Sequence, residues 1–299
     1  MRVLVTGSHG LIGSALCSAL GQGGHEVVRL VRGPAAEERE IRWDPARGEL
    51  DPAPLEGVDG AVHLAGAGIG DRRWTAARKQ QIVDSRVKST DLLSRRLSSL
   101  CSKPRVLVSG SAVGFYGDRG DEQLTEESPA GKGFLASVSS RWEAATAPAE
   151  EAGIRVVHIR TGIVQSSVGG ALGQLLPLFR FGVGGRIGSG RQYWSWIALA
   201  DEVGAIIDAV TTDGLSGPVN LTDPDPVTNA DYTRTLARVL RRPAIIPVPR
   251  FGLAALLGRE MADEILLGGQ RVYPERLQRS GYRFQYPDLE GALRAVLDR

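Results

Sequence analysis

The chain has 299 residues, of which 42% are hydrophobic and 23% charged, a composition typical of a soluble globular protein with a large core. Its 36 basic and 34 acidic residues nearly cancel, which excludes the basic surface of a nucleic-acid-binding protein. No apolar run approaches a membrane span, no room is left for a signal peptide, and Cys17 and Cys101 fit neither a disulfide framework nor a metal site, so we expect a cytoplasmic protein.

Apolar, β-rich runs alternate with helical patterns along the first half of the chain. The runs predict strands at Arg2–Val5, Glu26–Val31, Gly60–Leu64, Arg105–Val108 and Arg155–Ile159. The patterns between them predict helices at Leu11–Leu20, Thr75–Leu100 and Ser137–Glu151, with Pro148 ending or bending the last one early. This alternation is typical of an α/β fold with a Rossmann-like, doubly wound parallel sheet.

The alternation becomes irregular after the glycine-rich segment Gly182–Gly190, where prolines separate short elements. We therefore predict a dinucleotide-binding domain over residues 1–165. A smaller C-terminal α+β domain, which would define the substrate, is expected over residues 166–299, with residues 195–222 packing back on the first domain.

The first predicted strand leads directly into a glycine-rich turn with the spacing G-x-x-G-x-x-G. Gly7 lets the chain turn sharply, Gly10 lets the backbone approach a pyrophosphate, and Gly13 lets the following helix pack close to the sheet. Free N–H groups at the start of that helix would face the anion. The segment therefore predicts a phosphate site made by Gly7, Ser8, Gly10, Leu11, Ile12 and Gly13.

The second predicted strand is followed by Arg32. Dinucleotide sites usually place an acidic residue about 20 positions beyond the glycines to bind the ribose 2′-hydroxyl, whereas an arginine there suits a 2′-phosphate. A guanidinium forms charge-assisted bonds to phosphate, while a carboxylate would repel it. The sequence therefore favours NADP(H) over NAD(H) as the cofactor, the alternative being that Arg32 is one more solvated surface charge.

Several further segments extend the pattern over nearly the whole chain. They are His63-Leu64-Ala65-Gly66, Ser109 to Gly117, Gly188-Ser189-Gly190-Arg191-Gln192, and a C-terminal module from about Asn220 to Leu289. With these segments the chain resembles the atypical extended short-chain dehydrogenases/reductases, the "epimerase family" proteins of NAD-dependent epimerase/dehydratase type, which carry a C-terminal domain of unknown function.

The resemblance implies where the cofactor and the reaction would lie. Ser111 matches the family's catalytic serine, and Tyr116 is a second candidate acid, with a packing tyrosine as the alternative. The family's Tyr-x-x-x-Lys pair is missing, because Phe134 and Val138 stand at the corresponding positions. Phenylalanine has no proton to exchange, and valine cannot hold the ribose hydroxyls as the lysine does. The implied cofactor contacts are His63 as a structural contact, Leu64, Ala65, Gly66, Arg86, Ser109 and Thr161.

Two basic residues have competing interpretations. Lys132 lies beside the vacated tyrosine position and is either a substitute acid or a solvated loop lysine. Arg86 stands where extended relatives usually place an asparagine near the cofactor. It is expected either to pair with a phosphate or an acidic substrate, or to form a salt bridge on the helix surface.

A cluster of aromatic and polar residues follows the glycine-rich segment and predicts the substrate site. Its members are Arg191, Gln192, Trp194 and Trp196. Alternatively, the two tryptophans fill the domain junction. The family pattern Trp-Ile-His-Ile-Asp-Asp reads Trp196-Ile197-Ala198-Leu199-Ala200-Asp201 here, and the two alanines remove hydrogen-bonding capacity.

Two functions remain open at this stage. The first is an NADP(H)-dependent oxidoreductase or epimerase acting on a small polar or nucleotide-linked substrate. The second is an NADPH-binding regulatory protein with little or no catalysis. Relatives often form homodimers through helices that correspond to residues 75–100 and 137–151.

Overall fold

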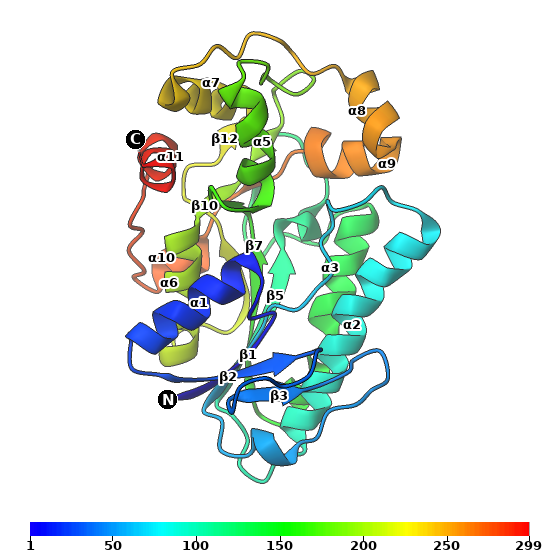
Figure 1. Ribbon diagram of the computed structural model, residues 1–299, viewed down its shortest axis with the longest axis vertical. Helices are drawn as coiled ribbons and strands as arrows, with labels where there is room; N and C mark the ends of the chain where they lie inside the picture. Colours follow the sequence, from blue (N-terminus) through cyan, green and yellow to red (C-terminus); the bar gives the residue numbers. More distant parts are fainter. Residues whose placement is uncertain (299) are drawn as a thin grey trace.

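Seven strands form one parallel sheet in the order β11-β7-β5-β4-β1-β2-β3. The computed structural model describes residues 1–298, and Figure 1 shows this sheet in the lower lobe. The strands are β1 (Arg2–Thr6), β2 (Glu26–Val31), β3 (Glu40–Arg42), β4 (Gly60–His63), β5 (Val106–Ala112), β7 (Arg155–Thr161) and β11 (Gly217–Leu221). The predicted α/β class with a Rossmann-like sheet is confirmed.

Helices cover both faces of the sheet because the buried side chains of each strand alternate between two cores. In β1, Val3 and Val5 face a core shared with helices α1 (Leu11–Gln22) and α6 (Leu199–Thr211). Leu4 faces the opposite core, which contains Leu93 and Leu97 of helix α2. Figure 1 shows α1 and α6 on one side of the strands and helices α2 (Ala76–Ser98) and α3 (Phe134–Ala144) on the other.

The predicted helix over residues 137–151 is two helices in the structure. α3 starts earlier, at Phe134, and ends at Ala144, and a short helix α4 (Ala147–Glu151) follows. Pro148 lies in the first turn of α4, where the missing N–H costs no intrahelical hydrogen bond. Pro148 therefore marks a break in the helix, as the sequence indicates.

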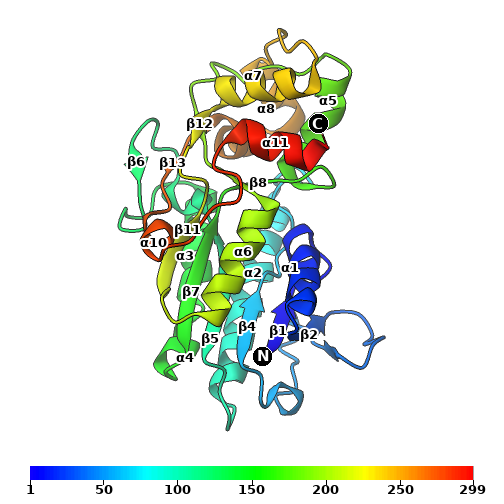
Figure 2. The ribbon, with the colours of Figure 1, turned by 90° about the vertical axis from the view of Figure 1, so that its left-hand side faces the viewer.

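The upper lobe contains most of the C-terminal half of the chain (Figure 2). Its helices are α5 (Gly170–Arg180), α7 (Asn229–Leu240), α8 (Arg250–Leu257), α9 (Arg259–Ala262) and α11 (Leu289–Leu297). Two small strand pairs join β8 (Ile163–Gln165) to β10 (Trp196–Ala198), and β9 (Tyr193–Trp194) to β12 (Val227–Thr228). A third apolar core fills this lobe, and α6 and β11, from the segment 195–222, lie with the sheet of the lower lobe.

Residues 271–279 return to the lower lobe before α11. Strand β13 (Arg271–Val272) pairs with β6 (Gln123–Leu124), and helix α10 (Glu275–Arg279) packs near β11. Just before them, the π-helical turn η3 (Asp263–Leu267) lies against the start of α3. No helix within residues 1–298 combines the length and the apolar character that crossing a bilayer requires.

Candidate active site

The glycine turn between β1 and α1 has the geometry of a phosphate cradle. Gly7 has φ +68°, and a Cβ on Gly13 would lie 2.2 Å from the Gly7 carbonyl oxygen, so neither position accepts a side chain without rearrangement. No side chain caps α1, and no acidic residue lies in its first turn. The N–H groups at the helix start are therefore free to bind an anion, and the turn fits a dinucleotide pyrophosphate.

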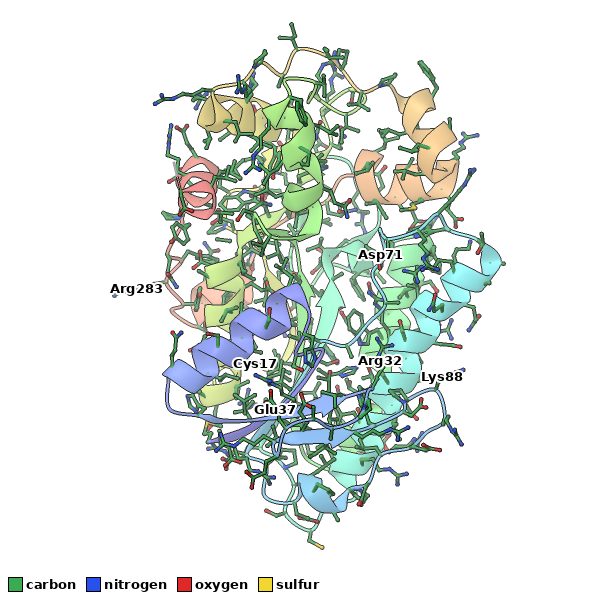
Figure 3. All side chains as sticks on the ribbon, in the orientation of Figure 1. Cys17, Arg32, Glu37, Asp71, Lys88 and Arg283 are labelled. Atoms are coloured by element: carbon green, nitrogen blue, oxygen red, sulfur yellow. The ribbon has the colours of Figure 1, made fainter. Side chains whose placement is uncertain are left out.

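Arg32 directly follows the carboxyl end of β2, the strand beside β1 (Figure 3). The side chain is exposed. Folds of this kind commonly use a residue at the end of this strand to contact the adenosine ribose of a dinucleotide.

His63, expected beside the cofactor, is fully buried at the end of β4. Its Nδ1 lies 2.7 Å from Thr6 Oγ1 and its Nε2 lies 3.1 Å from Ser89 Oγ. Burial, aided by the charge of Arg86, lowers the pKa of His63 to about 3, so the ring is neutral. The side chain therefore supports the loop Leu64–Gly66 and does not itself reach a ligand.

Two other predicted site residues are corrected by their burial. Ser109 is completely buried in β5, so its hydroxyl cannot contact the cofactor. Tyr116, predicted as a catalytic acid, is also completely buried, and its hydroxyl donates to Asn220 Oδ1 at 2.7 Å. Burial raises the pKa of this phenol, which opposes proton release. Tyr116 is therefore a packing residue, the alternative that the sequence left open.

Ser111 lies at the carboxyl end of β5 and is part of a buried polar network. Its Oγ donates to Glu143 Oε1 at 2.6 Å. Arg160 donates to both oxygens of Glu143, from Nε at 2.8 Å and from Nη2 at 2.9 Å. The side chains of Arg160 and Glu143 are only 4% and 12% exposed, so this fork holds the carboxylate in one orientation.

The network continues across the sheet because its members occupy facing positions on neighbouring strands. Ser111 of β5 lies opposite Arg160 of β7, and Arg160 lies opposite Asn220 of β11. Arg160 Nη1 donates to the Tyr116 hydroxyl at 3.0 Å, and its guanidinium lies 3.5 Å from the centre of the Phe115 ring. These contacts fix the environment of Ser111.

The positions vacated by the family's tyrosine and lysine are filled with apolar side chains. The Phe134 ring packs edge-on against Trp74 with ring centres 4.9 Å apart, and Lys79 Nζ lies 5.2 Å from the Phe134 ring centre. Val138 is buried in a small core with Ile82. Lys132 is exposed on the loop before α3.

A buried carboxyl group lies behind the end of β7. Thr161, a predicted cofactor contact, donates from Oγ1 to Glu202 Oε1 at 2.8 Å. Glu202 is completely buried in the first turn of α6, and its Oε2 has no hydrogen-bond partner in the described chain. Burial raises the pKa of Glu202 to about 8, so the carboxyl is protonated at neutral pH.

A cleft of about 610 Å³ lies between residues of the upper lobe and Asp118, which precedes β6. Gln192, a predicted substrate contact, lines it, and its Nε2 donates to Ile187 O and Leu266 O. The other lining residues are Asp118, Gly188, Ser189, Arg250, Asp263, Leu267 and Gly268. No group of three or more His, Cys, Asp or Glu side chains that could hold a metal ion occurs in residues 1–298.

The remaining predicted substrate contacts do not line this cleft. Trp194 and Trp196 are 5% and 0% exposed in the core of the upper lobe, and Trp196 Nε1 donates to Asp225 O. They are core residues of the upper lobe, which differs both from the predicted substrate contacts and from the alternative that they fill the domain junction. Arg191 is exposed and lies outside the cleft lining.

The sequence did not single out Glu143, Arg160 or Glu202. A signal for Arg160 exists, since an arginine in the apolar run Arg155–Thr161 requires a partner when the strand is central. Nothing in the spacing identifies Glu143 as that partner, and Glu202 belongs to an ordinary amphipathic helix pattern.

Comparisons with known proteins agree with this geometry. Residues 3–221 match the model of the NAD dependent epimerase/dehydratase family, and residues 248–296 match a domain of unknown function, DUF1731. The epimerase family protein Mb2239 of Mycobacterium bovis is 46% identical over 291 residues, 97% of this chain and 96% of that protein.

Two solved structures extend the comparison. The human epimerase family protein SDR39U1 (isoform 2), solved with NADPH, has a TM-score of 0.92 at 35% identity. The match covers 100% of this chain and 99% of the human chain. The UDP-glucuronic acid 4-epimerase of Bacillus cereus, solved with UDP-glucuronic acid and NAD, has a TM-score of 0.78 at 19% identity, over 100% of this chain and 98% of its own. The second likeness is one of fold alone.

Proposed function

Because the chain belongs to the NAD-dependent epimerase/dehydratase family, we propose that it is an NADP(H)-dependent oxidoreductase or epimerase-like enzyme acting on a small polar or nucleotide-linked substrate. The cradle at Gly7–Gly13 and the exposed guanidinium of Arg32 support the choice of cofactor. The NADPH in the structure of the human relative is consistent with it. The cofactor would accept or supply hydride when bound.

The observation that carries the proposal is the hydrogen bond from Ser111 to Glu143. A serine hydroxyl has one proton, and Glu143 already accepts it, so Ser111 can only accept a further hydrogen bond. An alcohol group can donate such a bond, whereas a carbonyl oxygen cannot. The site therefore favours binding of a substrate hydroxyl, oriented toward the carboxyl end of β5.

The same hydrogen bond provides a path for the proton of that hydroxyl. The substrate proton passes to Ser111 Oγ while the Ser111 proton passes to Glu143 Oε1, which leaves the serine neutral. Arg160 keeps Glu143 aligned for this transfer through its two hydrogen bonds. The pair Ser111–Glu143 would replace the missing tyrosine, and reduction would use the same path in reverse.

The experiment has two stages. Thermal-shift measurements with NADPH, NADP⁺, NADH and NAD⁺ test the cofactor, and a ligand at 100 times its dissociation constant is expected to stabilise the fold by about 2.7 kcal/mol. A panel of alcohols is then screened with NADP⁺. Ser111→Ala and Glu143→Gln are each expected to reduce turnover by about 10²- to 10⁴-fold while NADPH binding persists. Full turnover in both variants would contradict the relay.

The second candidate function, an NADPH-binding regulatory protein, is favoured by a different observation. Phe134 and Val138 are packed against α2 and leave no acid at the family's tyrosine position. Tight NADPH binding with no turnover across carbonyl, alcohol and sugar-nucleotide panels would support this candidate.

A further inference from the structure

Arg86 of α2 has a half-buried side chain, and its guanidinium lies against the loop that follows β4. Its Nη1 donates to Ala67 O at 2.9 Å and to Ile82 O at 3.3 Å. Its Cζ lies 5.0 Å from the Trp142 ring centre, and a Cβ on Gly66 would lie only 3.1 Å from it. The guanidinium is therefore held between α3 and the loop, and the expected alternative of a salt bridge on the helix surface does not describe it.

Within residues 1–298, no acid compensates this half-buried charge. Burial and the nearby Arg78 lower the pKa of Arg86 to about 10, and no carboxylate of residues 1–298 offsets them. The recorded acceptors, both backbone carbonyls, use only Nη1, which leaves the N–H groups of Nε and Nη2 for other partners. Neither nitrogen is among the buried side-chain atoms that lack a partner, so both are open to solvent and can donate to a ligand that takes the place of water.

Arg86 lies close to the place where α3 lacks a basic residue for binding the ribose hydroxyls. Val138 stands where the family's lysine would hold the ribose hydroxyls, and it packs against Ile82 of α2. Arg86 follows Ile82 by one helical turn on the same face of α2, and its guanidinium covers Trp142, one turn beyond Val138. Helix α2 thus places the guanidinium of Arg86 beside the face of α3 that carries apolar side chains.

The strand order identifies the half of the cofactor that Arg86 would meet. Along the sheet, β2 carries Arg32, β1 carries the phosphate cradle, β4 leads to Gly66, and β5 carries Ser111. A dinucleotide whose pyrophosphate lies on the cradle and whose adenosine lies at Arg32 extends toward β4 and β5 with its other half. The Trp142 ring that covers Arg86 also contacts Gly110, since a Cβ there would lie 2.7 Å from it.

We propose that Arg86 binds the nicotinamide half of the dinucleotide, donating hydrogen bonds to its ribose hydroxyls in place of the lysine that α3 lacks. This inference rests on the proposed cofactor and goes beyond it, because it assigns a separate residue to each end of the ligand. Arg32 contacts the adenosine end, and Arg86 contacts the nicotinamide end.

Calorimetric titration with two ligands separates these roles. NADPH contains both halves, whereas adenosine 2′,5′-bisphosphate lacks the nicotinamide ribose. Arg86→Gln is expected to weaken NADPH binding by about 10- to 100-fold, the range of a lost charge-assisted hydrogen bond, and to leave the bisphosphate affinity unchanged. Arg86→Lys is expected to restore part of the NADPH affinity. Arg32→Gln, the matched control, is expected to weaken both ligands.

The outcomes that overturn the inference are distinct from those that overturn the cofactor. Equal losses for both ligands in a folded Arg86→Gln protein, or no loss for either, would refute the role of Arg86. A loss confined to substrate affinity would assign Arg86 to a substrate anion and refute it as well. Failure of the wild-type protein to bind either ligand would refute the proposed cofactor.

Labelling of the wild-type protein provides a test that does not depend on the variants folding. Phenylglyoxal modifies arginines that solvent reaches, as it reaches Nε and Nη2 of Arg86, and peptide mass spectrometry reports each modified site. NADPH is expected to protect Arg86 and Arg32, whereas the bisphosphate is expected to protect Arg32 alone. Equal labelling of Arg86 in the presence of the two ligands would contradict the proposal.

Discussion

Replacing the buried carboxyl of Glu202 by an amide is expected to change how the stability of the protein depends on pH. Glu202 is completely buried, and burial raises its pKa to about 8 from the ordinary value of 4.5. Between these two values the folded state keeps a proton that the unfolded state releases. The free energy of unfolding contributed by this group therefore falls as pH rises through that interval.

The size of the effect follows from the width of the interval. From 4.5 to about 8 is roughly 3.5 pH units, and each unit is worth about 1.4 kcal/mol for one proton. Glu202 thus contributes a loss of at most roughly 5 kcal/mol between acidic and mildly basic pH. Glu202→Gln removes this loss, because the amide does not titrate and its carbonyl oxygen still accepts from Thr161.

Urea denaturation at pH 5, 6, 7 and 8 measures the prediction. The variant is expected to resemble the wild type at pH 5 and to exceed it increasingly toward pH 8. Glu151→Gln, the same chemical change at an exposed position of α4, is expected to leave the pH dependence unchanged. Asp223, whose pKa burial raises to about 7, keeps its own contribution in both variants. Parallel curves for wild type and Glu202→Gln would refute the reasoning.

Three further predictions concern the cradle, the cofactor choice and the contact between the lobes. Gly13→Ala places a methyl group 2.2 Å from the Gly7 carbonyl oxygen and is expected to abolish NADPH binding in a titration, whereas Gly21→Ala, which meets no atom within 4 Å, should keep binding and stabilise α1 by about 0.5–1 kcal/mol. Normal binding in the first variant would contradict the geometry. Arg32→Gln is expected to reduce the preference for NADPH over NADH by about tenfold, and an unchanged ratio of dissociation constants would assign the 2′-phosphate to another residue. Glu264→Ala removes the acceptor of two amides at the start of α3 and is expected to lower the free energy of unfolding by about 1–2 kcal/mol in urea denaturation. An unchanged free energy of unfolding would show that this contact does not stabilise the fold.

The sequence predicted those parts of the fold that local patterns determine. The five central strands were found because each is a short segment rich in apolar residues, and α1 because its glycines and apolar positions follow one another directly. The edge strands β3 and β11 were missed, since β3 is short and polar and β11 contains Pro218 and Asn220. Both strands form by pairing with a neighbouring strand, β3 with β2 and β11 with β7, and their own sequences do not reveal this pairing.

The candidate site divides in the same way. The phosphate cradle is a single local segment, so its spacing was sufficient to identify it. The network of Ser111, Glu143 and Arg160 joins residues from β5, α3 and β7, and no spacing rule connects them. Trp194 was misassigned because an aromatic cluster beside glycines also describes the core of a small lobe.

The carboxylate of Glu264 accepts from the amides of Phe134 and Leu135, so a residue near the end of the chain completes a helix of the lower lobe. A hybrid protein that joined this sheet to an unrelated tail would leave those two amides bare unless the new tail carried an acid at the equivalent place. The sheet domain and the C-terminal segment therefore cannot be exchanged independently, because a change in one restricts which sequences the other can have.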